Sequence, residues 1–123
     1  MFDHVGLNVR DYAASRAFYE SALAPLGYGV VMAFDEWKAC AFGPEGEPGF
    51  WIAEREPSGT GTHVALVVPE RSSVEAFHEA ALTAGGTDNG APGLRDQYHP
   101  TYFGAYVLDP DGNNVEAVCH GPA

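Results

Sequence analysis

Two histidines, His4 and His63, begin two similar hexapeptides, HVGLNV and HVALVV. Imidazole is the commonest metal ligand in proteins, so two such histidines facing one cavity favour a metal site over the alternative, a pair of hydrogen-bonded structural histidines. Glu116 lies between the apolar residues Val115 and Ala117, where a carboxylate is costly unless it is paired or bound to a cation. An edge glutamate in solvent is the alternative there. Two imidazoles and one carboxylate are typical of non-haem iron oxygenases and, with other metals, of Lewis-acid enzymes.

The two hexapeptides belong to a longer internal repeat. Shifting the sequence by 59 positions aligns the 25 residues from Asp3 to Gly27 with 10 identities and no gap, which include the two histidines. An internal repeat of half the chain predicts two copies of one structural unit.

The hydrophobic pattern gives each half the order strand, helix, strands. In HVGLNV the apolar residues alternate with the others, as in a half-buried strand. The predicted strands are 4–9, 28–34, 37–42, 50–54, 63–68, 102–108 and 113–118, and the predicted helices are 12–27, capped by Asp11, and 72–86. The segment 87–100 is the least regular. We therefore expect one α+β domain of two βαβββ modules, residues 1–57 and 61–123, with helices outside a curved mixed sheet around a cavity. The modules could pair within one chain or by exchange in a dimer.

Strand parity gives the candidate ligands a direction. Because Val5, Leu7 and Val9 would pack under the helix, His4 should point into the cavity, and His63 should do the same in the second half. The turn DPDG at 109–112 predicts a hairpin that pairs Tyr106 with Glu116 on one face.

Composition excludes several classes of function. The formal net charge of −11 argues against nucleic acid or an anionic membrane surface as partner. No apolar run approaches the ~20 residues of a membrane span, and the first residues do not read as a signal peptide. The two cysteines, Cys40 and Cys119, favour a reducing cytoplasm.

The motifs DHVGLNVRDYAASRAFYESAL, THVALVV and YVLDPDGNNVEAV together resemble the vicinal oxygen chelate superfamily, which includes glyoxalase I, extradiol dioxygenases, fosfomycin-resistance thiol transferases and bleomycin-resistance proteins. The resemblance covers nearly the whole chain and implies a metal cavity with His4, His63 and Glu116 as ligands. Glyoxalase I has a second glutamate where the repeat places Ile52, and extradiol dioxygenases have a tyrosine ten residues before the glutamate, as Tyr106 is here. No single activity of the superfamily is favoured.

The sequence thus predicts an enzyme that depends on a divalent ion (Fe, Mn, Zn or Ni) and acts on a small, metal-chelating oxygenated or aromatic substrate, as a lyase or a dioxygenase. In this prediction Glu116 and Tyr106 are catalytic, with Tyr106 donating a hydrogen bond to a substrate oxygen. Substrate-contacting residues would be Ile52, Arg95, Tyr98 and Tyr102. The alternative is a metal-free protein that sequesters a small molecule. A homodimer is expected in either case.

Overall fold

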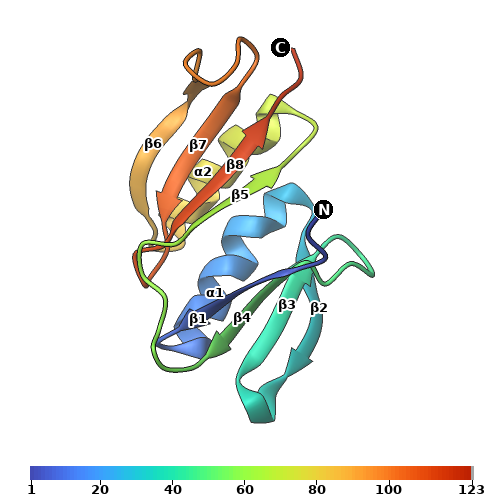
Figure 1. Ribbon diagram of the computed structural model, residues 1–123, viewed down its shortest axis with the longest axis vertical. Coiled ribbons are helices and arrows are strands. Elements are labelled where there is room, and N and C mark those ends of the chain that lie inside the picture. Colours follow the sequence, from blue (N-terminus) through green and yellow to red (C-terminus); the bar gives the residue numbers. More distant parts are fainter. Residues whose placement is uncertain (123) are drawn as a thin grey trace.

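The computed structural model describes residues 1–122 and shows two similar halves (Figure 1). The first half contains β1 (Val5–Val9), α1 (Tyr12–Leu23), η1 (Ala24–Leu26), β2 (Gly29–Phe34), η2 (Asp35–Trp37), β3 (Ala39–Gly43) and β4 (Phe50–Glu54). The second half contains β5 (His63–Val67), α2 (Arg71–Thr83), β6 (Thr87–Leu94), β7 (Phe103–Leu108) and β8 (Asn114–Cys119). The predicted α+β fold of two βαβββ modules is confirmed.

Each module forms its own four-stranded mixed sheet, in the orders β1-β4-β3-β2 and β5-β8-β7-β6. The first strand of each module pairs in parallel with the last, and the other pairs are antiparallel. The strands β1 and β5 are therefore edge strands, and the two sheets remain separate within the chain instead of joining into one curved sheet.

One face of each sheet is covered by the helix of the same module, and α1 and α2 also contact each other. Alternating apolar residues such as Leu7, Ile52 and Val107 point to this helix-covered side and join Phe18 and Phe77 in one core. Asp11 caps α1 as expected, because its side chain accepts a hydrogen bond from the amide of Ala14 at 3.1 Å. Within residues 1–122, neither the length nor the apolar character of any helix suffices to cross a membrane.

A buried polar junction joins the two modules. The Tyr19 hydroxyl on α1 donates to Asp109, whose carboxylate also accepts from the amides of Asp111 at 2.9 Å and Asn113 at 2.8 Å. The Ser15 hydroxyl, one turn earlier on α1, donates to Asp111 at 3.3 Å. The turn between β7 and β8 is thereby tied to the helix of the other module.

The junction makes stability depend on pH at the alkaline end. Burial, reinforced by the negative charge of Asp109, raises the pKa of Tyr19 well above its usual value of 10.0. Above pH 10 the unfolded chain loses the phenolic proton of Tyr19, whereas the folded chain keeps it. The free energy of unfolding should therefore fall as the pH rises through and beyond about 10. Urea unfolding at pH 8 and pH 11 measures the change. Tyr19→Phe should show a smaller fall between these pH values, and an unchanged pH dependence in this variant would contradict the assignment.

The segment after α2 differs from expectation, because Thr87–Leu94 forms the strand β6 instead of an irregular loop. The register of its pairing with β7 shifts on both sides of Gly90. Gly90 has φ +155°, and a Cβ there would lie 2.7 Å from Cδ1 of Tyr106. Glycine is therefore needed at this point to bring β6 close to the tyrosine.

Candidate functional site

The exposed face of the second sheet brings a histidine and a glutamate together. Strand pairing aligns Ala65 with Glu116 and Glu116 with Tyr106, so all three share the face of His63. His63 Nε2 donates to Glu116 Oε1 at 2.8 Å. The Glu116 carboxylate is 1% exposed, whereas the His63 side chain is 51% exposed. The predicted pairing of Tyr106 with Glu116 is confirmed.

The second carboxylate oxygen of the glutamate also has a partner. The Tyr102 hydroxyl donates a hydrogen bond to Glu116 Oε2. Room for this contact comes from Gly104, where a Cβ would lie 3.3 Å from both Glu116 Oε2 and Tyr102 Cε1. The sequence predicted Tyr102 as a substrate-contacting residue but did not predict its contact with Glu116.

The other predicted substrate residues of the second module surround this group. The Tyr106 ring lies 6.3 Å from the ring of His63, and the guanidinium carbon of Arg95 lies 5.3 Å from the Tyr106 ring centre. Tyr98 packs against Tyr102 with ring centres 5.1 Å apart. The pKa values of both Tyr102 and Tyr106 are raised. Burial is the larger cause, and the neighbouring Glu116 carboxylate is the second. Both phenols are therefore protonated hydrogen-bond donors at neutral pH.

His4 lies apart from this group within one chain. It precedes β1, is 58% exposed, and its Nδ1 lies 2.7 Å from Oδ1 of Asp3. His4 lines a groove of about 830 Å³ together with residues 64–67 of β5, but the lining includes neither His63 nor Glu116. Among residues 1–122, no three His, Cys, Asp or Glu side chains are close enough to hold a metal ion. The predicted three-ligand set is not assembled in a single chain.

Ile52 requires a correction, because its side chain is fully buried in the core beneath α1. In the first sheet, Trp51 pairs with Gly6, whereas Ile52 pairs with Leu7. Gly6 corresponds in the internal repeat to Ala65, and Ala65 pairs with Glu116 in the second sheet. The position equivalent to Glu116 is therefore Trp51, and Ile52 does not face the substrate side. Parity alone could not separate the two positions because both residues are apolar.

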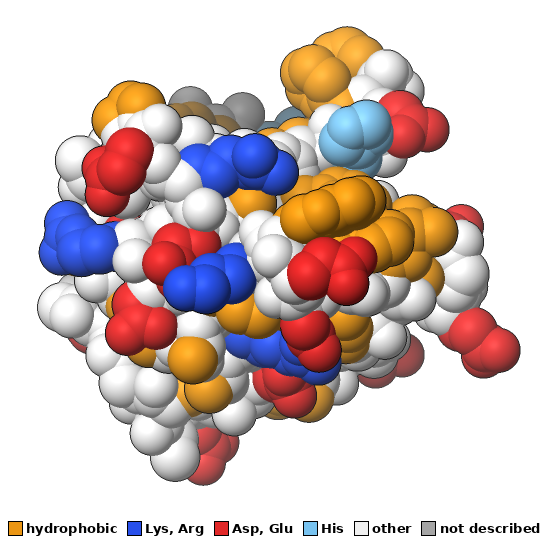
Figure 2. Space-filling view, turned by 90° about the horizontal axis from the view of Figure 1, so that it is seen from below, with side chains coloured by type: hydrophobic (Ala, Val, Ile, Leu, Met, Phe, Trp, Pro, Cys, Tyr) orange, Lys and Arg blue, Asp and Glu red, His pale blue; other side chains and the backbone are white. Residues whose placement is uncertain are grey.

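The exposed face of the first sheet is aromatic. The rings of Phe34 and Trp51 are nearly parallel, with centres 6.3 Å apart, and Trp37 lies 5.1 Å from Phe34. Trp37 is 62% and Met32 44% exposed. We call Met32, Phe34, Trp37 and Trp51 the aromatic face. Seen from the end of the molecule where η2 lies, hydrophobic side chains reach the surface among Asp and Glu side chains (Figure 2).

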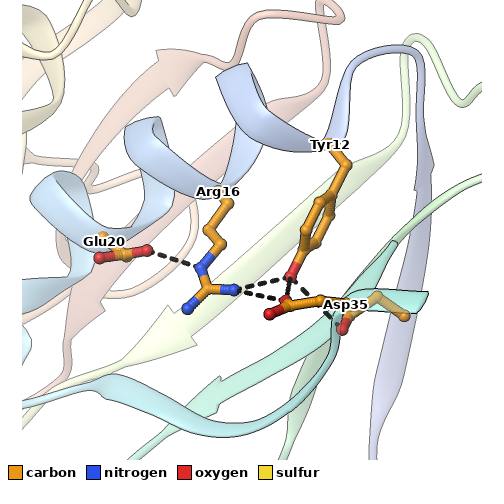
Figure 3. Close-up of polar contacts among 5 residues, drawn as sticks. Tyr12, Arg16, Glu20 and Asp35 are labelled. Carbon is orange, nitrogen blue, oxygen red and sulfur yellow. Dashed lines mark hydrogen bonds and ion pairs between the residues drawn. The ribbon is translucent and has the colours of Figure 1, made fainter. Parts of the chain in front are cut away.

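A second polar cluster, on α1, supports the aromatic face but does not resemble a binding site (Figure 3). Arg16 donates through Nε to Glu20 at 2.8 Å and through Nη1 to Asp35 at 3.1 Å and to the Tyr12 hydroxyl at 2.9 Å. Its contacts to two carboxylates leave the guanidinium neutralised. The cluster fastens η2, which carries Trp37, to the helix.

Comparison with known proteins agrees with this architecture. The family model for the Glyoxalase/Bleomycin resistance protein/Dioxygenase superfamily matches residues 1–117. The structure is similar to that of a glyoxalase/bleomycin resistance protein from Albidiferax ferrireducens T118, with a TM-score of 0.84, 30% identity, and coverage of 97% of this chain and 98% of that one. A search of curated proteins finds no match to the sequence.

Two further solved structures share the fold at lower identity. A glyoxalase/bleomycin resistance protein/dioxygenase family enzyme from Burkholderia phytofirmans PsJN has a TM-score of 0.71 at 19% identity, covering 97% of this chain and 98% of that one. A glyoxalase I mutant from Zea mays has a TM-score of 0.68 at 24% identity, covering 95% of this chain and 45% of that one. From the family match and the similarity to the Albidiferax protein, the chain belongs to the Glyoxalase/Bleomycin resistance protein/Dioxygenase superfamily.

Proposed function

We propose that the protein is a metal-dependent enzyme in which His63 and Glu116 supply two ligands to a divalent ion and His4 of a second copy supplies the third. The observation that carries the proposal is the convergence of His63 Nε2 and Glu116 Oε1, which lie 2.8 Å apart on the face of the second sheet that the helix does not cover. The substrate is a small oxygenated or aromatic molecule that chelates the ion, and the reaction is of lyase or dioxygenase type.

The chemistry of the donor set fits a divalent ion. An imidazole nitrogen and a carboxylate oxygen are ligands that Zn, Fe, Mn and Ni share. Glu116 is buried, and within the described part of the chain its only ion pair is with His63, which is charged only when protonated. A buried carboxylate without a permanent cation is costly, and a bound metal ion would remove that cost.

A homodimer would supply what one chain lacks. His4 is exposed and separate from the pair, while large apolar side chains are exposed on both modules, among them Met32 and Trp37 in the first and Val67 and Leu94 in the second. Exposed apolar surface of this kind supports association with a second copy. Contact between the first module of one copy and the second module of the other would bring a partner histidine to His63 and Glu116.

In this proposal the side chains around Glu116 bind and orient the substrate. A divalent ion held there would act as a Lewis acid toward a substrate oxygen. Tyr106, kept protonated, would donate a hydrogen bond to a substrate oxygen as negative charge develops on it. Arg95, stacked on the Tyr106 ring, places a positive charge beside that phenol.

One observation favours a second candidate, a metal-free protein that sequesters a small molecule. Trp51 occupies the position in the first module that Glu116 has in the second. The aromatic face would then bind a planar apolar ligand by stacking, without any ion. Stoichiometric metal in protein purified without chelator favours the enzyme, whereas tight binding of an aromatic ligand in the presence of EDTA favours sequestration.

Mixing two defective variants tests the shared site. His4→Ala and Glu116→Ala homodimers should each bind no divalent ion. After unfolding and refolding an equal mixture of the two variants, hybrid dimers should contain one intact site and one that lacks both residues. We expect recovery of about one quarter of the wild-type metal stoichiometry, because half of the dimers are hybrids and each has one working site of two. Equilibrium dialysis measures this, and no recovery in a mixture shown to contain dimers would refute the shared site.

A further inference from the structure

We infer that Tyr102 is a positioning residue that restricts Glu116 to binding a metal ion through one oxygen. The inference rests on the proposed metal site. Glu116 Oε1 faces His63 Nε2 at 2.8 Å, where an ion would bind, whereas Oε2 accepts the hydrogen bond of the Tyr102 hydroxyl. The hydrogen bond draws Oε2 toward the phenol and leaves Oε1 as the oxygen that faces the position of the ion.

The phenol is held in place from several sides before any ion arrives. The Tyr102 amide donates to the carbonyl of His99 at 3.0 Å, and the Tyr102 carbonyl accepts from the amide of Arg95 at 2.8 Å. The Tyr102 ring packs against Tyr98 and meets the ring of His120 edge-on at 5.3 Å. The hydroxyl group is therefore a fixed donor, since both the loop before β7 and the segment after β8 support it.

In the described residues, the hydroxyl of Tyr102 makes the only hydrogen bond to Oε2. A Cβ on Gly104 would lie 3.3 Å from this oxygen, so the backbone of β7 passes close to Oε2. Without the phenol, the oxygen of a nearly fully buried carboxylate would lack a partner and could turn toward the ion.

The coordination of the ion should change accordingly. A two-oxygen carboxylate raises the coordination number by one, which suits larger ions such as Ca²⁺ that accept six to eight oxygen ligands. A one-oxygen carboxylate suits smaller ions with few ligands, such as Zn²⁺ and Co²⁺. Partners that orient a metal ligand typically contribute 10–100-fold to affinity. Tyr102 would therefore favour small ions over large ones.

Cobalt binding tests the inference, because the intensity of the visible Co²⁺ bands falls when the coordination number rises. Compared with the wild type, Tyr102→Phe should bind Co²⁺ about 10–100-fold more weakly and give weaker visible bands, while Ca²⁺ affinity falls less. Tyr12→Phe is the matched control, since it removes the same hydroxyl group from α1, where that hydroxyl contacts Arg16 and Asp35 and not Glu116. This control should leave the affinity and the spectrum unchanged.

The outcomes separate the inference from the proposed function. Equal Co²⁺ affinity and equal spectra in the wild type and in Tyr102→Phe would overturn the inference and leave the metal site intact. No Co²⁺ binding by the wild-type protein would overturn both. Should Tyr102→Phe fail to fold, Gly104→Ala provides a second test, because its added methyl group crowds Glu116 Oε2 and Tyr102 Cε1 and should weaken Co²⁺ binding in the same direction. Unchanged binding in that variant would count against the inference.

Discussion

Asp109→Ala should lower the free energy of unfolding by about 3–5 kcal/mol, because the substitution leaves several buried donors without an acceptor at once. Asp109 is 5% exposed and accepts hydrogen bonds from the Tyr19 hydroxyl and from the amides of Asp111 and Asn113. The loss is a large fraction of the ~5–15 kcal/mol by which an ordinary domain is stable. Urea denaturation followed by circular dichroism measures it.

Tyr19→Phe is the matched control for this junction. It removes one hydroxyl and leaves the two amide contacts of Asp109 in place, so it should cost only about 1 kcal/mol. If Asp109→Ala unfolds at the same urea concentration as the wild type, the polar junction does not contribute to the association of the modules, and the apolar contacts between α1 and α2 are sufficient.

Glu116→Gln should weaken the binding of divalent ions at least ~100-fold and, in the presence of EDTA, leave the fold as stable as the wild type or more stable by about 1 kcal/mol. The amide has the shape of the carboxylate and can still bond to His63 and Tyr102, but it carries no charge to desolvate. Isothermal titration with Co²⁺ and urea unfolding in EDTA measure the two effects.

The control for this variant is Glu75→Gln, which changes the same functional group at an exposed position on α2. Both properties should remain as in the wild type. Glu116→Gln protein that keeps stoichiometric, tight metal binding would show that Glu116 is not a ligand, and a marked loss of stability in EDTA would show that its charge is needed for folding.

The sequence predicts the elements well where one face of a strand is buried. The alternation of apolar and other residues in HVALVV predicted the sheet face on which His63 lies, and the DPDG turn predicted the pairing of Tyr106 with Glu116. Both predictions were possible because period-two patterns and tight turns are local properties of the sequence. The internal repeat gave the two modules for a related reason, since equal hydrophobic patterns fold into equal units.

Other features depend on contacts that local patterns do not encode. The segment of β6 contains two glycines and a proline, a composition typical of loops, and its strand exists because Gly90 allows a close approach to Tyr106. Trp51 and Ile52 are both apolar, so only the pairing of β1 with β4 distinguishes their faces. The separation of His4 from His63 depends on how the modules pack through α1, α2 and the Asp109 junction.

Trp51 and Glu116 occupy equivalent positions in the two modules but differ in chemistry, and this difference has a consequence for stereochemistry. Two identical modules would enclose a pocket with its own two-fold axis, and a substrate could enter such a pocket in two equivalent orientations. In the proposed dimer one wall would present the aromatic rings of the first module, and the other would present the imidazole, carboxylate and phenols of the second module. The two pockets of this dimer would be identical to each other, but the two walls within each pocket would differ in chemistry. A prochiral substrate would therefore present the same face to the polar wall at every turnover, and the product would be a single enantiomer.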